Sequence, residues 1–151
     1  MALARSAGTL FMNADRTFVD SNILICAFDV DAGNRHELAK TTLKAIWNEK
    51  SGAVSMQVLQ EFYWNVTRKI ATPLPRDVAR KIVKQYAHWC VLTGPGDMEV
   101  AFSLEEVAQI GFWDALIVAA AVKAGAKRIL TEDLHHGQKI AGVLIENPLL
   151  P

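Results

Sequence analysis

The sequence predicts an α/β protein with a three-layer α/β/α fold, in which a central parallel sheet of about five strands is flanked by helices. Short β-branched and apolar runs alternate along the chain with longer segments of helical period. Hydrophobic residues make up 51% of the 151 residues and charged residues 21%, which is typical of a globular protein. A chain of this length can bury one hydrophobic core. We therefore expect a single domain over residues 17–151, preceded by an N-terminal extension of residues 1–16.

Five short runs rich in β-branched, aliphatic and aromatic residues are the predicted strands. They cover residues 17–19, 53–56, 89–92, 128–131 and 143–145. The first run stops at Asp20, Ser21 and Asn22, three residue types that favour turns and helix caps. Because strands that alternate with helices pair in parallel, we expect helices on both faces of the sheet.

Apolar residues recur with a period near 3.6 between these runs, which predicts helices. The predicted helices are residues 36–50, residues 58–70, a segment that starts near Pro75, residues 97–109 and residues 112–124. The second of them carries Glu61, and Asp97 is expected to cap the fourth. The last is almost wholly apolar apart from Asp114 in its first turn, so we expect it to be buried.

Charge and cysteine content restrict the function classes. The 16 basic and 16 acidic side chains cancel, so no global positive field marks the chain as a nucleic-acid binder. Cys26 and Cys90 stand far apart, with no Cys-x-x-Cys pair for zinc or redox chemistry, which fits a reducing cytoplasm. The longest apolar run, residues 115–122, is too short to cross a bilayer, so we expect a cytoplasmic protein without a membrane partner.

Acidic residues stand where ligands gather in a parallel sheet. Asp20 and Asp133 come directly after predicted strands, and ligands bind at the carboxyl ends of strands, near the point where strand order reverses. If the first and fourth predicted strands are neighbours, these two carboxylates converge. Asp114, at a helix start, and Glu61, on the helix after the second strand, can reach the same place.

Four carboxylates held close together raise one another's pKa values unless cations neutralise them. A donor set of oxygen atoms alone selects hard ions, so we expect Mg²⁺ or Mn²⁺. Such ions polarise a phosphodiester and stabilise charge on its leaving oxygen. The set of acids therefore predicts hydrolysis of a nucleic-acid backbone.

Each acid also has an ordinary structural interpretation. Asp20 and Asp133 suit helix caps, and Asp114 suits a first helical turn, where the helix dipole favours an acid. Glu61 could face solvent, because its neighbours leave its direction open. The metal-site interpretation depends on the four acids as a set.

Four phrases of the sequence resemble the four motifs of PIN-domain nucleases, in the same order along residues 17–150. They are Phe18-Val19-Asp20-Ser21-Asn22, Ser55-Met56-Gln57-Val58-Leu59-Gln60-Glu61-Phe62, Phe112-Trp113-Asp114-Ala115-Leu116-Ile117 and Leu130-Thr131-Glu132-Asp133-Leu134. The resemblance implies a metal-dependent endoribonuclease. It also implies, for toxins of the VapC type within the family, a homodimer that a small antitoxin protein inhibits.

The resemblance assigns roles to particular residues. The acids that match the catalytic and metal-binding set are Asp20, Glu61, Asp114 and Asp133. Asn22 matches a polar position beside the first acid, and Thr131 matches a hydroxyl position before the last acid. Glu132 adjoins Asp133, so the sequence leaves open which of the two is the fourth acid.

Two alternatives compete with the nuclease hypothesis. Asp29 and Asp31 resemble the Asp-x-Asp start of haloacid-dehalogenase-like phosphatases, in which the first Asp is the nucleophile. Those enzymes have Thr or Val two positions after the second Asp, where this chain has Gly33. The other alternative is a non-catalytic PIN-like module that binds RNA or a protein, but such a module would gain nothing from the mutual repulsion of four acids.

The tryptophans and one basic cluster have simpler interpretations. The indoles of Trp47, Trp64, Trp89 and Trp113 have apolar neighbours, so we expect core or dimer contacts rather than platforms for bases. The basic residues between Arg76 and Lys84 are expected to form a solvated helix face, with RNA or antitoxin binding as the alternative.

Overall fold

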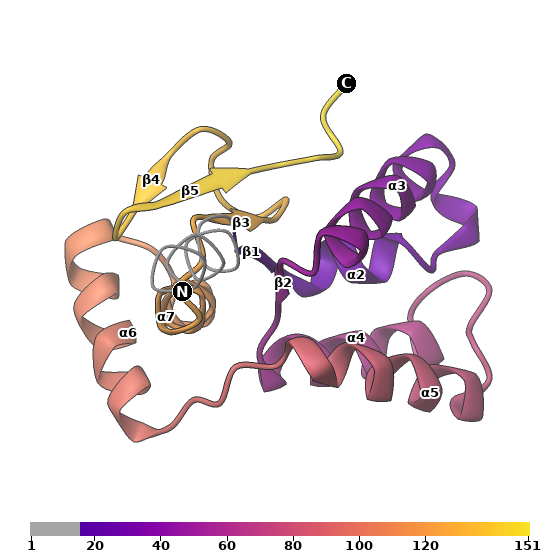
Figure 1. The fold of residues 1–151 in the computed structure, drawn as a ribbon, viewed down its shortest axis with the longest axis horizontal. Coiled ribbons are helices and arrows are strands. Elements are labelled where there is room, and N and C mark those ends of the chain that lie inside the picture. Colours follow the sequence, from indigo (N-terminus) through magenta and orange to yellow (C-terminus); the bar gives the residue numbers. More distant parts are fainter. Residues whose placement is uncertain (1–15) are drawn as a thin grey trace, which may run out of the picture.

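The computed structural model describes residues 16–151 (Figure 1), so the predicted extension lies outside the described residues except for Arg16. The strands are β1 (Thr17–Val19), β2 (Gly52–Ala53), β3 (Arg128–Leu130), β4 (Lys139–Ile140) and β5 (Val143–Glu146). The helices are α2 (Ser21–Cys26), α3 (Asn34–Glu49), α4 (Met56–Arg68), α5 (Arg76–Tyr86), α6 (Pro95–Ala108) and α7 (Phe112–Lys123), with short 3₁₀ turns η1 (Val30–Ala32) and η2 (Ala87–Trp89).

The strands form one sheet in the order β2-β1-β3-β5-β4. All neighbouring pairs are parallel except β4 with β5. The chain places β2 on one side of β1 and β3 on the other, so strand order reverses at β1. In the β1–β3 pair Val19 stands opposite Leu130, which brings the residues that follow, Asp20 and Thr131, side by side at the carboxyl edge.

Helices cover both faces of this sheet, as the sequence predicts. In Figure 1 the α6–α7 pair and the α2–α3 pair lie on opposite sides of the sheet, with the α4–α5 hairpin below α2. Phe18, Ile129 and Ile145 from the three central strands are fully buried between these layers, together with Phe62 of α4 and Val118 of α7. Within residues 16–151, no helix is both long and apolar enough to cross a membrane.

The second and third predicted strands differ from the structure. Met56 starts α4 rather than ending a strand, because Ser55 caps that helix by accepting a hydrogen bond from the amide of Val58. The predicted strand over residues 89–92 is wrong: Cys90 makes only an isolated parallel bridge to Val54. Val54 follows β2, and Ser55 already caps α4, so the extended segment ends before a second pair can form.

The strand β4 was not predicted by the sequence analysis. β4 pairs antiparallel with β5 through a two-residue turn at Ala141 and Gly142, both of which have positive φ angles. Such a turn closes a tight hairpin, but Ala at a positive φ gives no sequence signal for it. The predicted fold class is confirmed, with this one strand antiparallel.

Two helix starts also differ. α2 begins directly after Asp20, where we expected only a turn or cap. α6 begins at Pro95 rather than after Asp97, and the Asp97 carboxylate accepts a hydrogen bond from the amide of Gly94 at 2.8 Å. The acid thus satisfies a free amide from inside the first turn instead of preceding the helix.

Candidate metal centre

Asp20 lies at the junction of β1 and α2, at the edge where strand order reverses. Its backbone amide donates to the carbonyl of Leu130 at 3.0 Å, which fixes it to the end of β3. Its Oδ1 accepts a hydrogen bond from the amide of Ser21 at 2.7 Å, so Asp20 does cap a helix. Only 5% of the residue is exposed. The cap therefore holds the carboxylate in a defined orientation at the edge of the sheet.

The other oxygen of Asp20 is held by the residues expected to support it. The hydroxyl of Thr131 donates to Asp20 Oδ2 at 2.8 Å, and the side-chain nitrogen Nδ2 of Asn22 lies 3.5 Å from the same atom. Thr131 Oγ1 also accepts from the amide of Asp133 at 3.1 Å. The side-chain Oδ1 of Asn22 accepts from the backbone amide of Glu132 at 3.3 Å. One network thus positions the segment after β1 and the segment after β3 against each other.

Glu61 faces this network from α4, which resolves the direction that the sequence left open. The hydroxyl of Ser21 lies 3.3 Å from Glu61 Oε2 and 3.5 Å from Asp20 Oδ1. Ser21 is the residue that the sequence analysis missed as part of the site. Its small hydroxyl side chain directly after a strand-terminal acid is the signal that could have identified it.

Asp114, the third candidate acid along the chain, stands in the first turn of α7. Burial raises the pKa of its carboxyl group, and the negative charge of Asp133 raises it further. The charge of Asp133 raises the pKa of Asp20 as well. The helix N-terminus stabilises a negative charge at Asp114, which makes it a favourable position for an acid beside other acids.

The pKa of Asp20 is raised from 3.8 to about 6. The largest cause is burial, which removes water from the carboxylate. The hydrogen bonds from Thr131 and Ser21 lower the pKa, while the charges of Asp133 and Glu61 raise it. Asp20 is therefore a buried acid whose negative charge the protein alone compensates only in part.

The adjacent acids Glu132 and Asp133 have different surroundings. Glu132 forms an ion pair with Arg35 of α3 on the rim of the site. The charge of Asp133 instead acts on both Asp20 and Asp114. The charge of Asp133 thus acts on two of the other candidate acids, whereas the carboxylate of Glu132 pairs with Arg35.

The donor set suits a hard divalent cation. All four side chains offer carboxylate oxygens, and neither Cys26 nor Cys90 belongs to the group. Among residues 16–151, however, no three acidic, histidine or cysteine side chains are close enough to form a finished coordination shell. Carboxylates that repel one another rest apart, and a cation would draw them together.

Asp29 and Asp31 do not form a phosphatase site. The segment before Asp29 is the helix α2, so this Asp-x-Asp pair does not stand at the carboxyl end of a strand, where ligands gather in an α/β sheet. Asp29 caps the short η1 turn by accepting from the amide of Asp31, whose own carboxylate accepts from Thr72 at 2.6 Å. Both acids are committed to the loop between α2 and α3.

Three of the four tryptophans are exposed and not core residues. Trp89 is half-buried and packs against Tyr86, in line with the expectation of core contacts, whereas Trp47 contacts the same ring but is 43% exposed. Trp113 is 68% exposed, although it belongs to the helix that we expected to be buried, and Trp64 is 53% exposed. Both lie near acids of the candidate site, since Trp113 precedes Asp114 and Trp64 is one helical turn after Glu61.

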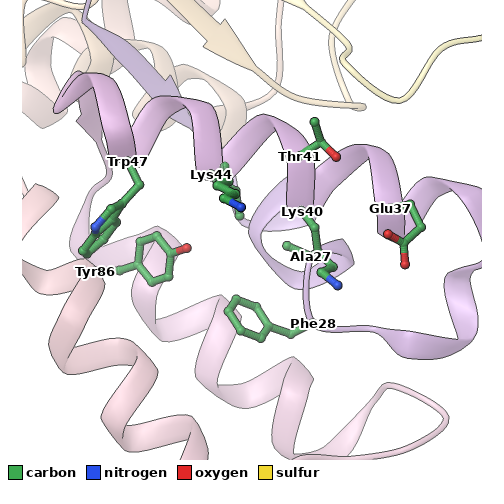
Figure 2. A pocket seen from close by; sticks show the side chains of 9 residues that line it. Ala27, Phe28, Glu37, Lys40, Thr41, Lys44, Trp47 and Tyr86 are labelled. Carbon is green, nitrogen blue, oxygen red and sulfur yellow. The ribbon is translucent and has the colours of Figure 1, made fainter.

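A separate groove of about 480 Å³ lies beside α3, away from the acids (Figure 2). Phe28, Trp47 and Tyr86 line its wall, and Lys40 and Lys44 reach over them from α3. None of the four candidate acids lines it. The carboxylate chemistry therefore belongs to the edge of the sheet and not to this groove.

Fold and site together define an α/β protein with an acidic centre at the switch point of a mostly parallel sheet. A comparison with protein families matches residues 17–140 to the PIN domain. The chain belongs to the PIN-domain family, whose members are in general nucleases that use divalent metal ions. A comparison with curated proteins finds no match.

Solved structures with a similar fold include chains of two VapBC assemblies. One is VapBC2 from Rickettsia felis bound to a DNA fragment from its promoter, with 18% identity, a TM-score of 0.57, and coverage of 87% of this chain and 97% of that chain. The other is DNA-bound VapBC from Salmonella typhimurium, with 16% identity, a TM-score of 0.60, and coverage of 89% and 98%. At these identities the similarity establishes the fold.

Proposed function

We propose that this chain is an endoribonuclease that depends on Mg²⁺ or Mn²⁺ and hydrolyses RNA phosphodiester bonds. The observation that carries the proposal is the incompletely compensated charge of Asp20, a buried carboxylate that feels the charges of Asp133 and Glu61. A group with this environment either takes up a proton or binds a cation. Membership of a family of nucleases makes the cation the better supported outcome.

Asp20, Glu61, Asp114 and Asp133 are the residues that would hold the ion. A bound divalent cation would stabilise the negative charge that develops on the phosphodiester during hydrolysis. Thr131 and Asn22 keep Asp20 in one orientation, and Ser21 does the same for Glu61. Such supporting hydrogen bonds reduce the reorganisation that the site undergoes when it binds its ligand.

RNA cleavage by the purified chain tests this proposal. We expect the wild-type protein to cleave single-stranded RNA with Mn²⁺ or Mg²⁺, and EDTA to stop the reaction. Asp20→Asn keeps the shape of the side chain and should abolish cleavage, whereas Asp29→Asn, in the loop after α2, should retain it. Equal cleavage by wild type and Asp20→Asn would refute the site. Cleavage that continues in EDTA would refute the metal dependence.

We further propose that the chain is a cytoplasmic toxin, active as a homodimer and inhibited by a small antitoxin protein. The support is the fold similarity to chains of VapBC assemblies and the exposed apolar side chains of α6 and α7, which suit a protein contact. Expression of the chain alone should arrest bacterial growth, and expression of Asp20→Asn should not. Normal growth with soluble wild-type protein would contradict the toxin role and leave the nuclease proposal to the cleavage assay.

A further inference from the structure

One face of α4 carries a continuous polar and aromatic stripe. Gln57, Glu61, Trp64 and Arg68 follow one another at spacings of four, three and four residues, so they lie along one side of the helix. Trp64 and Arg68 form the outer half of this stripe, and both are exposed.

The inner half of the stripe is attached to the acid site at two points. Ser21 contacts Glu61 at 3.3 Å, beside Asp20. The side chain of Gln57 lies 3.5 Å from the carbonyl of Trp113, which precedes Asp114. Trp64 follows Glu61 by three residues, or about 4.5 Å along the helix axis. Trp64 therefore lies within the length of one nucleotide of a phosphate bound at Glu61.

The side chains of Trp64 and Arg68 are arranged as a pair. The Arg68 guanidinium lies 4.1 Å from the centre of the Trp64 ring, a cation–π contact that holds both side chains in place. Arg68 also donates to the hydroxyl of Thr67 at 2.9 Å. In the part of the chain that the structure describes, Arg68 pairs with no carboxylate. Its positive charge is available to a ligand.

We propose that Trp64 and Arg68 bind an unpaired nucleotide of the RNA next to the cleaved phosphate, an inference that rests on the proposed nuclease function. The base stacks on the exposed part of the indole, and Arg68 attracts the adjacent phosphate. Charge favours RNA over a protein partner here, because the pair is cationic and adjoins a site for phosphodiesters. A base inside a duplex cannot reach the indole, so the pair selects single strands or loops.

The neighbouring helix extends the positive surface away from the acids. Arg80 of α5 donates to the hydroxyl of Tyr63 on α4 at 3.2 Å, which brings the basic face of α5 alongside the helix that carries Trp64. An RNA strand that leaves the acids past Trp64 therefore meets further positive charge from α5.

RNA binding by a non-cleaving parent tests the pair without any dependence on turnover. Fluorescence anisotropy with a labelled single-stranded 12-nucleotide RNA measures Kd for Asp20→Asn and for double variants that add a second change. We expect Trp64→Ala to weaken binding about 5- to 100-fold, and Trp64→Phe to recover most of the affinity. Arg68→Gln should lower the slope of log K against log salt by about 0.7. Leu92→Ala, at an apolar side chain that is 80% exposed and lies outside α4, α6 and α7, is the control and should not change Kd.

Light scattering on the same variants separates RNA binding from a protein contact. An unchanged Kd in Trp64→Ala, absence of RNA binding by the Asp20→Asn parent, or a loss of oligomer mass in Trp64→Ala would overturn the inference. Cleavage by the wild-type chain is scored separately. Binding that depends on Trp64 in a chain that does not cleave would refute the nuclease proposal, whereas cleavage with Trp64-independent binding would refute only the nucleotide site.

Discussion

The hydroxyl of Thr131 donates a 2.8 Å hydrogen bond to Oδ2 of Asp20, across the two strand ends where the order of the sheet reverses. Thr131 Oγ1 also accepts from the amide of Asp133, so the same hydroxyl connects the Asp20 carboxylate to the segment after β3. This contact joins the fold to the candidate site, because the parallel pairing of β1 and β3 alone places the two residues side by side.

Replacement of Thr131 tests the contribution of this contact. Thr131→Val keeps the shape of the side chain but removes the 2.8 Å donor to Oδ2 of the buried Asp20 carboxylate, which should reduce the free energy of unfolding by about 1–3 kcal/mol. It should also weaken Mn²⁺ binding about 10- to 100-fold, as expected for a residue that orients a ligand. Thr131→Ser retains the hydroxyl and should stay close to wild type in both thermal unfolding and metal titration. A Val variant that matches wild type would show that Asp20 is oriented by other contacts.

The raised pKa of Asp20 predicts a stability that depends on pH in the absence of metal. The folded chain keeps a proton on Asp20 up to about pH 6, whereas an unfolded chain loses it near 3.8. This group therefore lowers the free energy of unfolding progressively between those pH values, by at most about 3 kcal/mol above pH 6. In EDTA, Asp20→Asn should melt several degrees above wild type at pH 7.5, with the difference vanishing near pH 4.

Two further features of that experiment are specific to the site. The stabilisation of Asp20→Asn relative to wild type should be smaller than about 3 kcal/mol. The side-chain amide of this variant would present a donor to Thr131 Oγ1, which already accepts from the amide of Asp133. Mg²⁺ should raise the melting temperature of wild type and leave Asp20→Asn unchanged. A wild-type chain that melts above the variant in EDTA at pH 7.5 would contradict the incomplete compensation of Asp20.

Glu132 and Asp133 should respond differently to loss of charge. Asp133→Asn should reduce the rate of metal-dependent RNA cleavage by more than about 100-fold, beyond the effect typical of residues that only orient a metal ligand. Glu132→Gln breaks a partly exposed ion pair with Arg35 and should change the rate less than about fivefold. The reverse ranking in the cleavage assay would make Glu132 the fourth acid.

A tight packing contact at β2 gives a prediction about stability alone. A methyl group on Gly52 would lie 2.4–2.5 Å from ring atoms of Trp89, so Gly52→Ala forces that ring or the strand to move. We expect the free energy of unfolding to fall by about 1–3 kcal/mol, measured by urea denaturation. Gly96 in the first turn of α6 has open space around it and is the matched control. Gly96→Ala should be neutral or stabilising, and equal effects of the two changes would contradict the packing at Gly52.

Much of the site could be predicted because its acids stand at the ends of elements. Asp20 directly follows a short β-branched strand, and Asp114 opens a helix of apolar residues, so both positions are visible without a structure. The convergence of Asp20 with Asp133 depends on the pairing of β1 with β3, which the sequence analysis treated as a condition, and the structure confirms this pairing. Local sequence sufficed there because strand ends determine where side chains meet.

Features that depend on long-range packing could not be predicted in the same way. The segment after Trp89 has strand-like composition, but only Val54 is free to pair with it. Nothing near Glu132 in the sequence reveals that Arg35 pairs with it from α3. The exposure of Trp64 is equally hidden, since its apolar neighbours Phe62 and Val66 are buried on the opposite face of the same helix.

The central claim is that four carboxylates form one metal site, and isothermal titration of Mn²⁺ into single variants measures this most directly. Wild type should bind Mn²⁺, and Asp20→Asn, Glu61→Gln, Asp114→Asn and Asp133→Asn should each weaken binding at least about tenfold. Asp29→Asn should bind as wild type does. Wild-type affinity in all four variants, or no Mn²⁺ binding by the wild-type chain, would contradict the account.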